Sequence, residues 1–139
     1  KLDYECELAV VLGRDARDVP AGQTRDYIFG YTILNDVSAR DVQTAHKQWY
    51  FGKSLDGFTP IGPCIVTADA FADYPPRLGI RSFVNGEKRQ DSNTALQIFD
   101  IDHVIAELSQ GMDPPQFLKP GDVVRCEIEG IGTLTNLVE

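Results

Sequence analysis

The sequence contains no basic cluster and no long apolar segment. Its 21 Asp and Glu residues outnumber 13 Lys and Arg residues, and the formal net charge is -8 at pH 7. Nucleic acids and anionic membranes attract basic surfaces, so we expect neither as a partner. A membrane-spanning helix needs about 20 apolar residues, and no stretch approaches that length. An acidic chain of this kind is better suited to bind a cation or a small molecule.

Cysteine is also scarce, and its pattern argues against a cysteine metal site. The three residues Cys6, Cys64 and Cys126 are an odd number without metal-binding spacing. Because apolar or strand-like residues flank each one, we interpret them as reduced thiols and expect a cytosolic protein. The charged start is not typical of a signal peptide. Since the chain opens abruptly in a predicted strand, we expect further residues to precede it in the protein.

The remaining composition is typical of one globular domain. Hydrophobic residues make up 42% and charged residues 24% of the 139 residues. That is enough to bury a core, and it is unlike the composition of a disordered chain. No internal repeat or low-complexity tract divides the chain. We therefore predict a single domain over residues 1–139.

Segments bounded by Gly and Pro predict a fold rich in strands. The predicted strands are residues 7–12, 30–34, 60–67, 122–128 and 132–137. The Asn85-Gly86 dipeptide lies between two further strand-like segments and predicts a hairpin with a type I′ turn over residues 80–90. A turn at residues 119–122 precedes the last two strands, and residues 129–132 connect them.

Short helices are predicted among these strands. Residues 24–29 suit one helical turn. Ser38 and Asp41 fit a capping box, which predicts a helix from there through His46.

A longer amphipathic helix is predicted near residue 100. Its apolar residues follow the i, i+3, i+4, i+7 spacing of one helical face, and they are Ile101, Val104, Ile105 and Leu108. Asp100 or Asp102 can cap its N-terminus, and Gly111 can end it. With two or three short helices among many strands, the predicted fold class is β-rich α+β.

Two glutamates open the first predicted strand. Side chains two apart on a strand share a face, so Glu5 and Glu7 bring like charges together beside an apolar segment. They either face water or hold something cationic. Asp36, just past the second strand, adds a third carboxylate in a loop that can offer ligands. Three carboxylates suit Mg²⁺, Mn²⁺ or Ca²⁺, although acidic residues at strand ends are also often simply solvated.

Six segments of the chain carry a family resemblance. In chain order they are LDYECELAVV, FGYTILNDVSARD, GKSLDGFTPIGP, VNGEKRQDSNT, LSQGM and FLKPGDVVRCEIEGIGTLTN. Together they resemble the catalytic domain of the fumarylacetoacetate hydrolase family over nearly the whole length of the chain. The resemblance implies a mixed β-sandwich roll, and relatives are commonly homodimers. It also implies one Mg²⁺ or Mn²⁺ ion bound by Glu5, Glu7 and Asp36.

The resemblance assigns roles to three further residues. Lys53, in the GKS segment, matches the catalytic lysine of the family. Arg40 and Gln43 match residues near the substrate, and their i, i+3 spacing places both on one helix face. From the residues alone, Lys53 could be an ordinary surface lysine, as most lysines are. Arg40 could likewise form an ion pair with one of three carboxylates, Asp26, Asp36 or Asp41.

The two histidines, Cys6 and the GKS motif are not expected to form further functional sites. His46 and His103 are expected on polar helix faces and not in catalysis. Cys6 is expected to pack on the strand face opposite to the glutamates. The GKS segment is not a phosphate-binding loop, because Lys47 stands where that motif needs glycine.

The resemblance implies a divalent-metal-dependent hydrolase that cleaves a C-C bond in a small 2-oxo or 1,3-dioxo acid, such as an acylpyruvate or fumarylpyruvate. The ion would act as a Lewis acid on the developing enolate, while Lys53 adds positive charge and Arg40 grips a carboxylate. The alternative is an isomerase or decarboxylase of hydroxymuconate-type dicarboxylates in aromatic catabolism. A third class, an inactive binding homologue, would be expected to have lost at least one of these residues.

Two parts of the family pattern are absent from the sequence. The His-Glu pair that activates water in such hydrolases comes from a segment before the E-x-E strand, which this sequence does not contain. Near residues 112–113, a stretch containing TGTP is missing between LSQGM and FLKPGD. This gap is either a genuine deletion, which would remove one wall of the pocket, or a mobile loop that belongs to the protein but not to this sequence.

Overall fold

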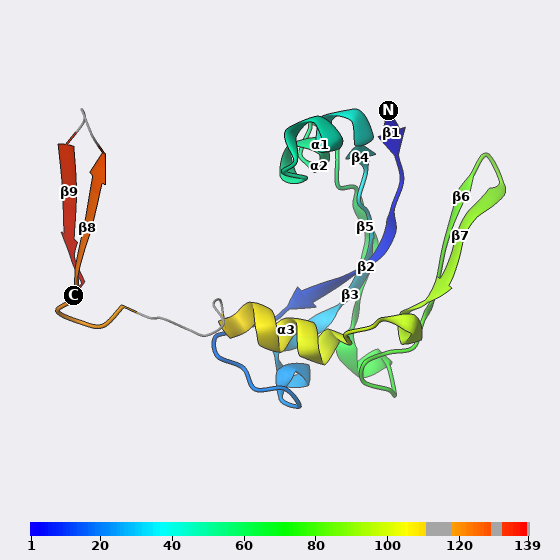
Figure 1. The fold of residues 1–139 in the computed structure, drawn as a ribbon. Coiled ribbons are helices and arrows are strands. Elements are labelled where there is room, and N and C mark those ends of the chain that lie inside the picture. The colour runs from blue at the N-terminus through cyan, green and yellow to red at the C-terminus, as the bar shows by residue number, and fades with distance from the viewer. Residues whose placement is uncertain (111–117, 129–131, 139) are drawn as a thin grey trace. The chain divides into compact units, whose positions relative to one another are not determined.

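The computed structural model describes residues 1–110, 118–128 and 132–138. It contains two compact units, Lys1–Ser109 and Gln110–Glu139. Strands dominate and a few short helices accompany them, so the predicted β-rich α+β class is confirmed (Figure 1). The single domain over residues 1–139 stays a prediction. None of the described helices is long and apolar enough to span a membrane.

A three-stranded antiparallel sheet is the frame of the larger unit. Its order is β2-β3-β5, formed by β2 (Cys6–Leu12), β3 (Ile28–Asn35) and β5 (Ile61–Thr67). These bounds lie close to the predicted ones. Because side chains alternate along a strand, Leu8 of β2 faces the core while Glu7 points to the other face.

The core of this unit lies where α3 (Ile101–Gln110) covers one face of the sheet. Tyr31 of β3 is 3% exposed and meets Phe71 edge to face, with ring centroids 5.3 Å apart. The core cluster consists of Ile28, Tyr31, Ile101 and Ile105, with Leu8, Val10, Ala68, Phe71 and Tyr74 packed against it. The opposite face of the sheet is the one to which Glu7 points.

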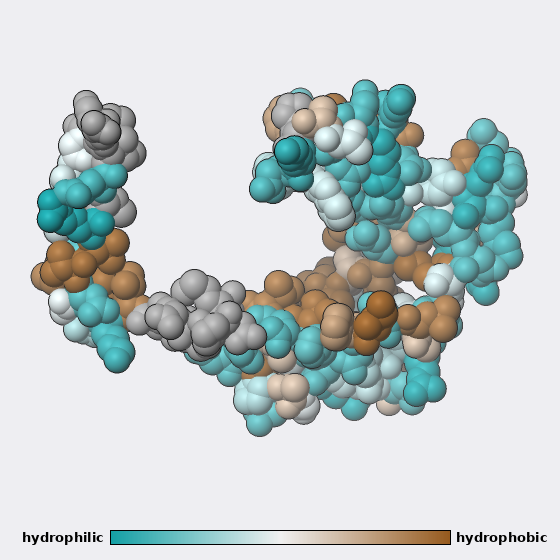
Figure 2. Space-filling view, viewed as in Figure 1, coloured by the Kyte–Doolittle hydropathy of each residue, from teal (hydrophilic) through white to brown (hydrophobic). Residues whose placement is uncertain are grey.

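The predicted amphipathic helix is confirmed as α3, but half of its apolar stripe is not covered by the described chain. Ile101 and Ile105 are buried, whereas Val104 is 41% and Leu108 is 78% exposed. Figure 2 shows the apolar surface beside this helix. The predicted stop at Gly111 lies outside the described residues.

The hydrogen bonds at the N-terminus of α3 show which of the two predicted residues, Asp100 or Asp102, caps the helix. Asp100 accepts a hydrogen bond from the main-chain N–H of His103 at 2.8 Å, as an N-cap residue does. Asp102 instead accepts from the main-chain N–H of Gly22 at 2.6 Å and from Thr24 Oγ1 at 2.5 Å. Asp102 therefore fastens the loop before β3 to the helix.

The predicted capping box is wrong, although the helix that it predicted exists. Ser38 belongs to the short strand β4 (Ser38–Ala39), and α1 (Arg40–His46) begins after it without a side-chain cap. The Ser38 hydroxyl donates to the main-chain oxygen of Asp36 at 3.1 Å, so it serves the preceding loop and not the helix. The neighbouring elements are β1 (Leu2–Asp3), which pairs with β4, and the short helix α2 (Tyr50–Lys53).

Short elements and hairpins complete the two units. The predicted helical turn is the 3₁₀ helix η1 (Thr24–Tyr27), and η2 (Ala68–Ala70) and η3 (Thr94–Leu96) are further 3₁₀ turns. In the smaller unit, β8 (Val123–Ile128) pairs with β9 (Gly132–Leu137), as predicted. The connection predicted at residues 129–131 lies outside the described residues.

The predicted hairpin is confirmed as β6 (Gly79–Val84) and β7 (Glu87–Asn93). Asn85 and Gly86 connect the strands with φ angles of 52° and 84°. Both angles are positive, as a type I′ turn requires.

Candidate metal centre

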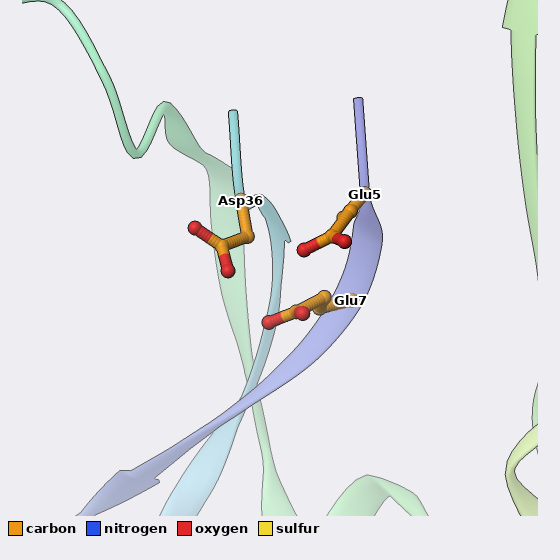
Figure 3. Close-up of side chains that lie close together, drawn as sticks. All are labelled: Glu5, Glu7 and Asp36. Carbon is orange, nitrogen blue, oxygen red and sulfur yellow. The ribbon is translucent and has the colours of Figure 1, made fainter. Parts of the chain in front are cut away.

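Three carboxylates meet where β2 begins and β3 ends. One oxygen each from Glu5, Glu7 and Asp36 lies within 4.8 Å of the others (Figure 3). The antiparallel register explains this meeting, because Cys6 pairs with Asn35 and places their neighbours side by side. The main-chain N–H of Asp36 also donates to the main-chain oxygen of Glu5 at 2.8 Å.

A lysine lies among these carboxylates. The Nζ of Lys53 donates to Glu5 Oε2 at 2.6 Å and to Oδ2 of Asp36. The Lys53 side chain is 20% exposed, and those of Glu5 and Asp36 are 29% and 19% exposed. Glu5 and Asp36 therefore share a cationic partner in a region that is partly shielded from water.

Arg40, the first residue of α1, holds Glu5 from the other side. Its Nη2 donates to Glu5 Oε1 at 2.6 Å, its Nε to Asp3 at 2.8 Å and its Nη1 to Gln43 Oε1 at 3.0 Å. Both oxygens of Glu5 are thus bound, each by a different cation. The described ion pairs of Arg40 include none of the three partners that the sequence suggested.

Close packing of α2 on α1 places Lys53 in the site. Gly52 is buried against Gln43, and a Cβ added to Gly52 would lie 2.8 Å from the Cβ of Gln43. Only a residue without a side chain allows this approach. Gln43 is itself buried, so Gln43 and Gly52 form a packed support directly beside Lys53.

Burial and the neighbouring charges shift the pKa values of Glu5, Glu7 and Lys53. The hydrogen bond from Lys53, followed by that from Arg40, lowers the pKa of Glu5 despite partial burial. Part of Glu7 is open to solvent, but desolvation of its carboxyl raises its pKa, and the charges of Asp36 and Glu5 raise it further. Burial alone would lower the pKa of Lys53, yet its hydrogen bonds to Asp36 and Glu5 outweigh burial and raise it. Of the three groups, Glu7 would therefore gain most from a bound cation, which would favour its charged form.

The donor set of this site fits a hard divalent cation. All three candidate ligands are carboxylate oxygens, which Mg²⁺ and Mn²⁺ prefer. Mg²⁺ needs only a few protein ligands, because it keeps water or substrate in its other positions. Glu5, Glu7 and Asp36 could therefore hold such an ion. Their assignment as ligands, and the roles of Lys53, Arg40 and Gln43, stay predictions.

The other residues considered from the sequence lie elsewhere. His103 is exposed on α3 and stacks on Phe99, with ring centroids 4.6 Å apart. The side chain of His46 lies outside the described atoms. Cys6 is a free thiol and lines a cavity of about 450 Å³ together with apolar residues that include Leu8 and Ile33.

Sequence reasoning missed three residues that hold the site together. Asp3 pairs with Arg40, as described above. The side-chain oxygen of Asn35 accepts from the main-chain N–H of Glu5 at 3.1 Å, and that of Gln90 accepts from the main-chain N–H of Cys6 at 2.9 Å. Asn35 and Gln90 lie inside the family-like segments FGYTILNDVSARD and VNGEKRQDSNT, and this position is the signal that could have identified them.

The chain matches one protein family over most of its length. The family model described as fumarylacetoacetate (FAA) hydrolase C-terminal matches residues 1–113. An uncharacterized protein of Staphylococcus saprophyticus is 41% identical over 158 aligned positions, which include 99% of this chain and 52% of that protein. The 158 positions exceed the 139 residues of this chain by 19, so that relative has residues without a counterpart here. The chain spans about half the length of the curated relatives it matches.

Solved structures of two differently named enzymes share this fold. A fumarylacetoacetate hydrolase from Exiguobacterium antarcticum is 42% identical with a TM-score of 0.74, covering 99% of this chain and 56% of that one. A 5-carboxymethyl-2-hydroxymuconate delta-isomerase from Mycobacterium smegmatis is 41% identical with a TM-score of 0.74, covering 98% and 58%. The fold class expected from the sequence agrees with both.

Proposed function

Since this chain belongs to the fumarylacetoacetate hydrolase family, we propose that it carries the site of a divalent-metal-dependent hydrolase. The substrate is a small 2-oxo or 1,3-dioxo acid of the acylpyruvate or fumarylpyruvate type. The reaction breaks a C-C bond and passes through an enolate.

One observation carries this proposal. Glu5, Glu7 and Asp36 bring their carboxylate oxygens within 4.8 Å of one another, with the Lys53 ammonium directly beside them. A surface cluster of solvated acids would not need a partly buried lysine among its members. The combination suits a metal ion next to a fixed positive charge.

The three carboxylates would hold Mg²⁺ or Mn²⁺, while Ca²⁺ suits the same oxygen donors. When bound, such an ion supplies a Lewis acid that polarises the 2-oxo group of the substrate. The chain itself supplies the shape of the site. Gly52 and Gln43 pack behind Lys53 and fix the distance of its ammonium from the carboxylates.

Lys53 and Arg40 would act directly on the substrate. The ammonium of Lys53 stays charged at neutral pH, because its pKa is raised, and it can stabilise the negative charge that gathers on an enolate oxygen. Arg40 uses three of its five N–H donors for Asp3, Glu5 and Gln43. Its remaining donors can bind a substrate carboxylate, and Gln43 holds the guanidinium for that purpose.

A second candidate function is an isomerase or decarboxylase of hydroxymuconate-type dicarboxylates in aromatic catabolism. Both candidates use the same enolate chemistry, and hydrolysis differs in requiring a base that activates water. Enolate chemistry without added water does not need such a base. The delta-isomerase from Mycobacterium smegmatis, at 41% identity, gives this candidate its support.

A substrate panel tests the proposal. The purified protein with Mn²⁺ is assayed with acylpyruvates, fumarylpyruvate, oxaloacetate and hydroxymuconate derivatives by the loss of enol absorbance, and the products are identified by mass. Pyruvate plus a carboxylic acid supports the hydrolase. An isomer of unchanged mass, or release of carbon dioxide, supports the second candidate instead.

Variants of the proposed metal ligands, compared with a control variant, test the site itself. Glu7→Gln and Asp36→Asn are expected to abolish turnover and divalent-metal binding together, because each removes one charged oxygen donor. Glu87→Gln changes an exposed glutamate on β7 and is expected to leave both unchanged. Full activity in Glu7→Gln or Asp36→Asn would overturn the site.

Two further expectations, one from the family resemblance and one from the cysteines, are also proposals. We expect a homodimer, which light scattering would show as twice the mass of the monomer. The cytosolic location expected from the sequence likewise stays a prediction.

A further inference from the structure

Three hydrogen bonds hold the main chain at Glu5 and Cys6, two of them at Glu5 and one at Cys6. The N–H of Glu5 donates to the side chain of Asn35 at 3.1 Å, and its oxygen accepts from the N–H of Asp36 at 2.8 Å. The next N–H along the chain, that of Cys6, donates to the side-chain oxygen of Gln90 at 2.9 Å. The last of these partners comes from β7 and is 84 positions away.

Gln90 lies beside the outer edge of the three-stranded sheet. β2 is an edge strand, since the sheet order is β2-β3-β5. The outer N–H groups of an edge strand have no neighbouring strand to accept them. At Cys6, a side chain from another hairpin supplies the acceptor that a fourth strand would otherwise provide.

Gln90 belongs to a paired part of the β6-β7 hairpin. It pairs with Ser82, next to the shift in strand register between Ser82 and Phe83, and Asn85 and Gly86 form the type I′ turn at the end of the hairpin. Gln90 is half-buried, whereas its neighbour Arg89 is exposed and pairs with Glu87 on the same strand. Gln90 therefore points toward β2, while Arg89 serves the hairpin alone.

We propose that Gln90 is a positioning residue of the metal centre, fixing the peptide between Glu5 and Glu7 so that their carboxylates converge on one cation. This inference rests on the proposed function, because it assumes that both glutamates are metal ligands. Gln90 touches neither substrate nor metal. Its carboxamide oxygen restrains the N–H of Cys6, which joins the two glutamates, and through it sets the distance between their side chains.

The alternative is that Gln90 only attaches the hairpin to the sheet. In that case, its loss would lower the stability of the protein without changing the affinity for a divalent ion beyond the effect of partial unfolding. Metal affinity measured on folded protein separates the two roles. Partners that orient metal ligands typically contribute about tenfold or more to metal affinity.

The experiment measures the Kd for Mn²⁺ by calorimetry, together with thermal unfolding of the metal-free protein. Gln90→Leu removes the acceptor at similar size, and Gln90→Glu retains an acceptor oxygen. Arg89→Leu is the matched control on the same strand. We expect Gln90→Leu to weaken Mn²⁺ binding by about tenfold. Gln90→Glu should bind Mn²⁺ nearly as tightly as the wild type, and Arg89→Leu should bind Mn²⁺ like the wild type.

Gln90→Asn covers the case in which Gln90→Leu does not fold. It keeps the carboxamide but is one methylene too short to reach Cys6, so it should also weaken Mn²⁺ binding. Folded Gln90→Leu or Gln90→Asn with wild-type Mn²⁺ affinity would overturn the inference alone. A wild-type protein that binds no Mn²⁺, or Glu7→Gln that binds as tightly as the wild type, would overturn the proposed function and this inference together.

Discussion

The Nζ of Lys53 lies 2.6 Å from Oε2 of Glu5 and also donates to Asp36. The lysine thus contacts two of the three carboxylates that we propose as metal ligands. A divalent ion that binds those oxygens competes with the ammonium for the same negative charge. Lys53 therefore has two opposite effects, since it opposes metal binding while it provides the charge that an enolate needs.

Lys53→Met separates these two effects. Removing the ammonium should abolish turnover, because no positive charge remains to stabilise the enolate oxygen. The same change should tighten Mn²⁺ binding by about tenfold, which corresponds to about 1.4 kcal/mol. Calorimetry of the variant with Mn²⁺ and a steady-state assay check both parts.

Lys88→Met is the control for this prediction. Lys88 is a half-exposed lysine that pairs with Asp91 on the hairpin. Its replacement should change neither turnover nor Mn²⁺ affinity. Weaker Mn²⁺ binding in Lys53→Met than in the wild type would show that the lysine orders the carboxylates and does not compete with the metal.

Gly52→Ala tests the packing that supports Lys53. The added Cβ would lie 2.8 Å from Gln43, so α1 and α2 must separate. We expect turnover to fall strongly and the free energy of unfolding to fall by about 1 to 3 kcal/mol, as for other overpacked sites. Mn²⁺ affinity should not fall, since the three carboxylates belong to other segments and the displaced ammonium competes less with the ion. Denaturant unfolding and calorimetry measure these effects.

Gly79→Ala is the matched control. The atoms nearest to a Cβ at Gly79 belong to the tip of the Arg81 side chain, at 3.3 Å, and this flexible group can move aside. Wild-type turnover in both variants would contradict the role of the contact between Gly52 and Gln43.

The parts of this site that the sequence predicted depend on local patterns. Alternation along β2 places Glu5 and Glu7 on one face, and the strand that ends before Asp36 is recognisable from its composition. The cap of α1 was predicted wrongly, because the hydroxyl of Ser38 donates to the main-chain oxygen of Asp36 in the preceding loop and does not accept an N–H group of the helix.

The supporting contacts could not be predicted in the same way. Arg40 pairs with Asp3, 37 positions away, and not with the aspartates close to it in sequence. Gln90 reaches Cys6 from a separate hairpin. Such pairs depend on how whole elements pack, and neither periodicity nor spacing encodes that arrangement.

Asp102 makes the stability of the larger unit depend on pH. Partial burial alone would raise the pKa of Asp102, but the hydrogen bonds from Thr24 and Gly22 outweigh it and hold the pKa below the ordinary value of 3.8. A lowered pKa in the folded state adds stability above the unfolded value, and this stability is lost as the pH falls through the folded value.

Asp102→Asn should therefore lower the free energy of unfolding by about 1 to 2 kcal/mol at pH 7. The difference from the wild type should shrink as the pH falls below about 3.8, because the carboxyl is then protonated first in the unfolded state and, at still lower pH, in the folded protein. Urea unfolding at neutral and acidic pH measures both values, and Asp69→Asn, at an exposed aspartate, serves as the control. A difference that stays constant with pH would assign the effect to shape and not to charge.

Removal of divalent ions tests the metal requirement without any substitution. Turnover should stop in a chelator and return when Mg²⁺ or Mn²⁺ is added in excess, because the carboxylates alone cannot polarise the substrate. Bound metal should also stabilise the folded state, by about 2.7 kcal/mol at an ion concentration one hundred times the Kd. The thermal midpoint of the wild type should then rise with Mn²⁺, while that of Glu7→Gln should not. Persistent turnover in the chelator, or an equal rise in both proteins, would exclude these carboxylates as the metal ligands.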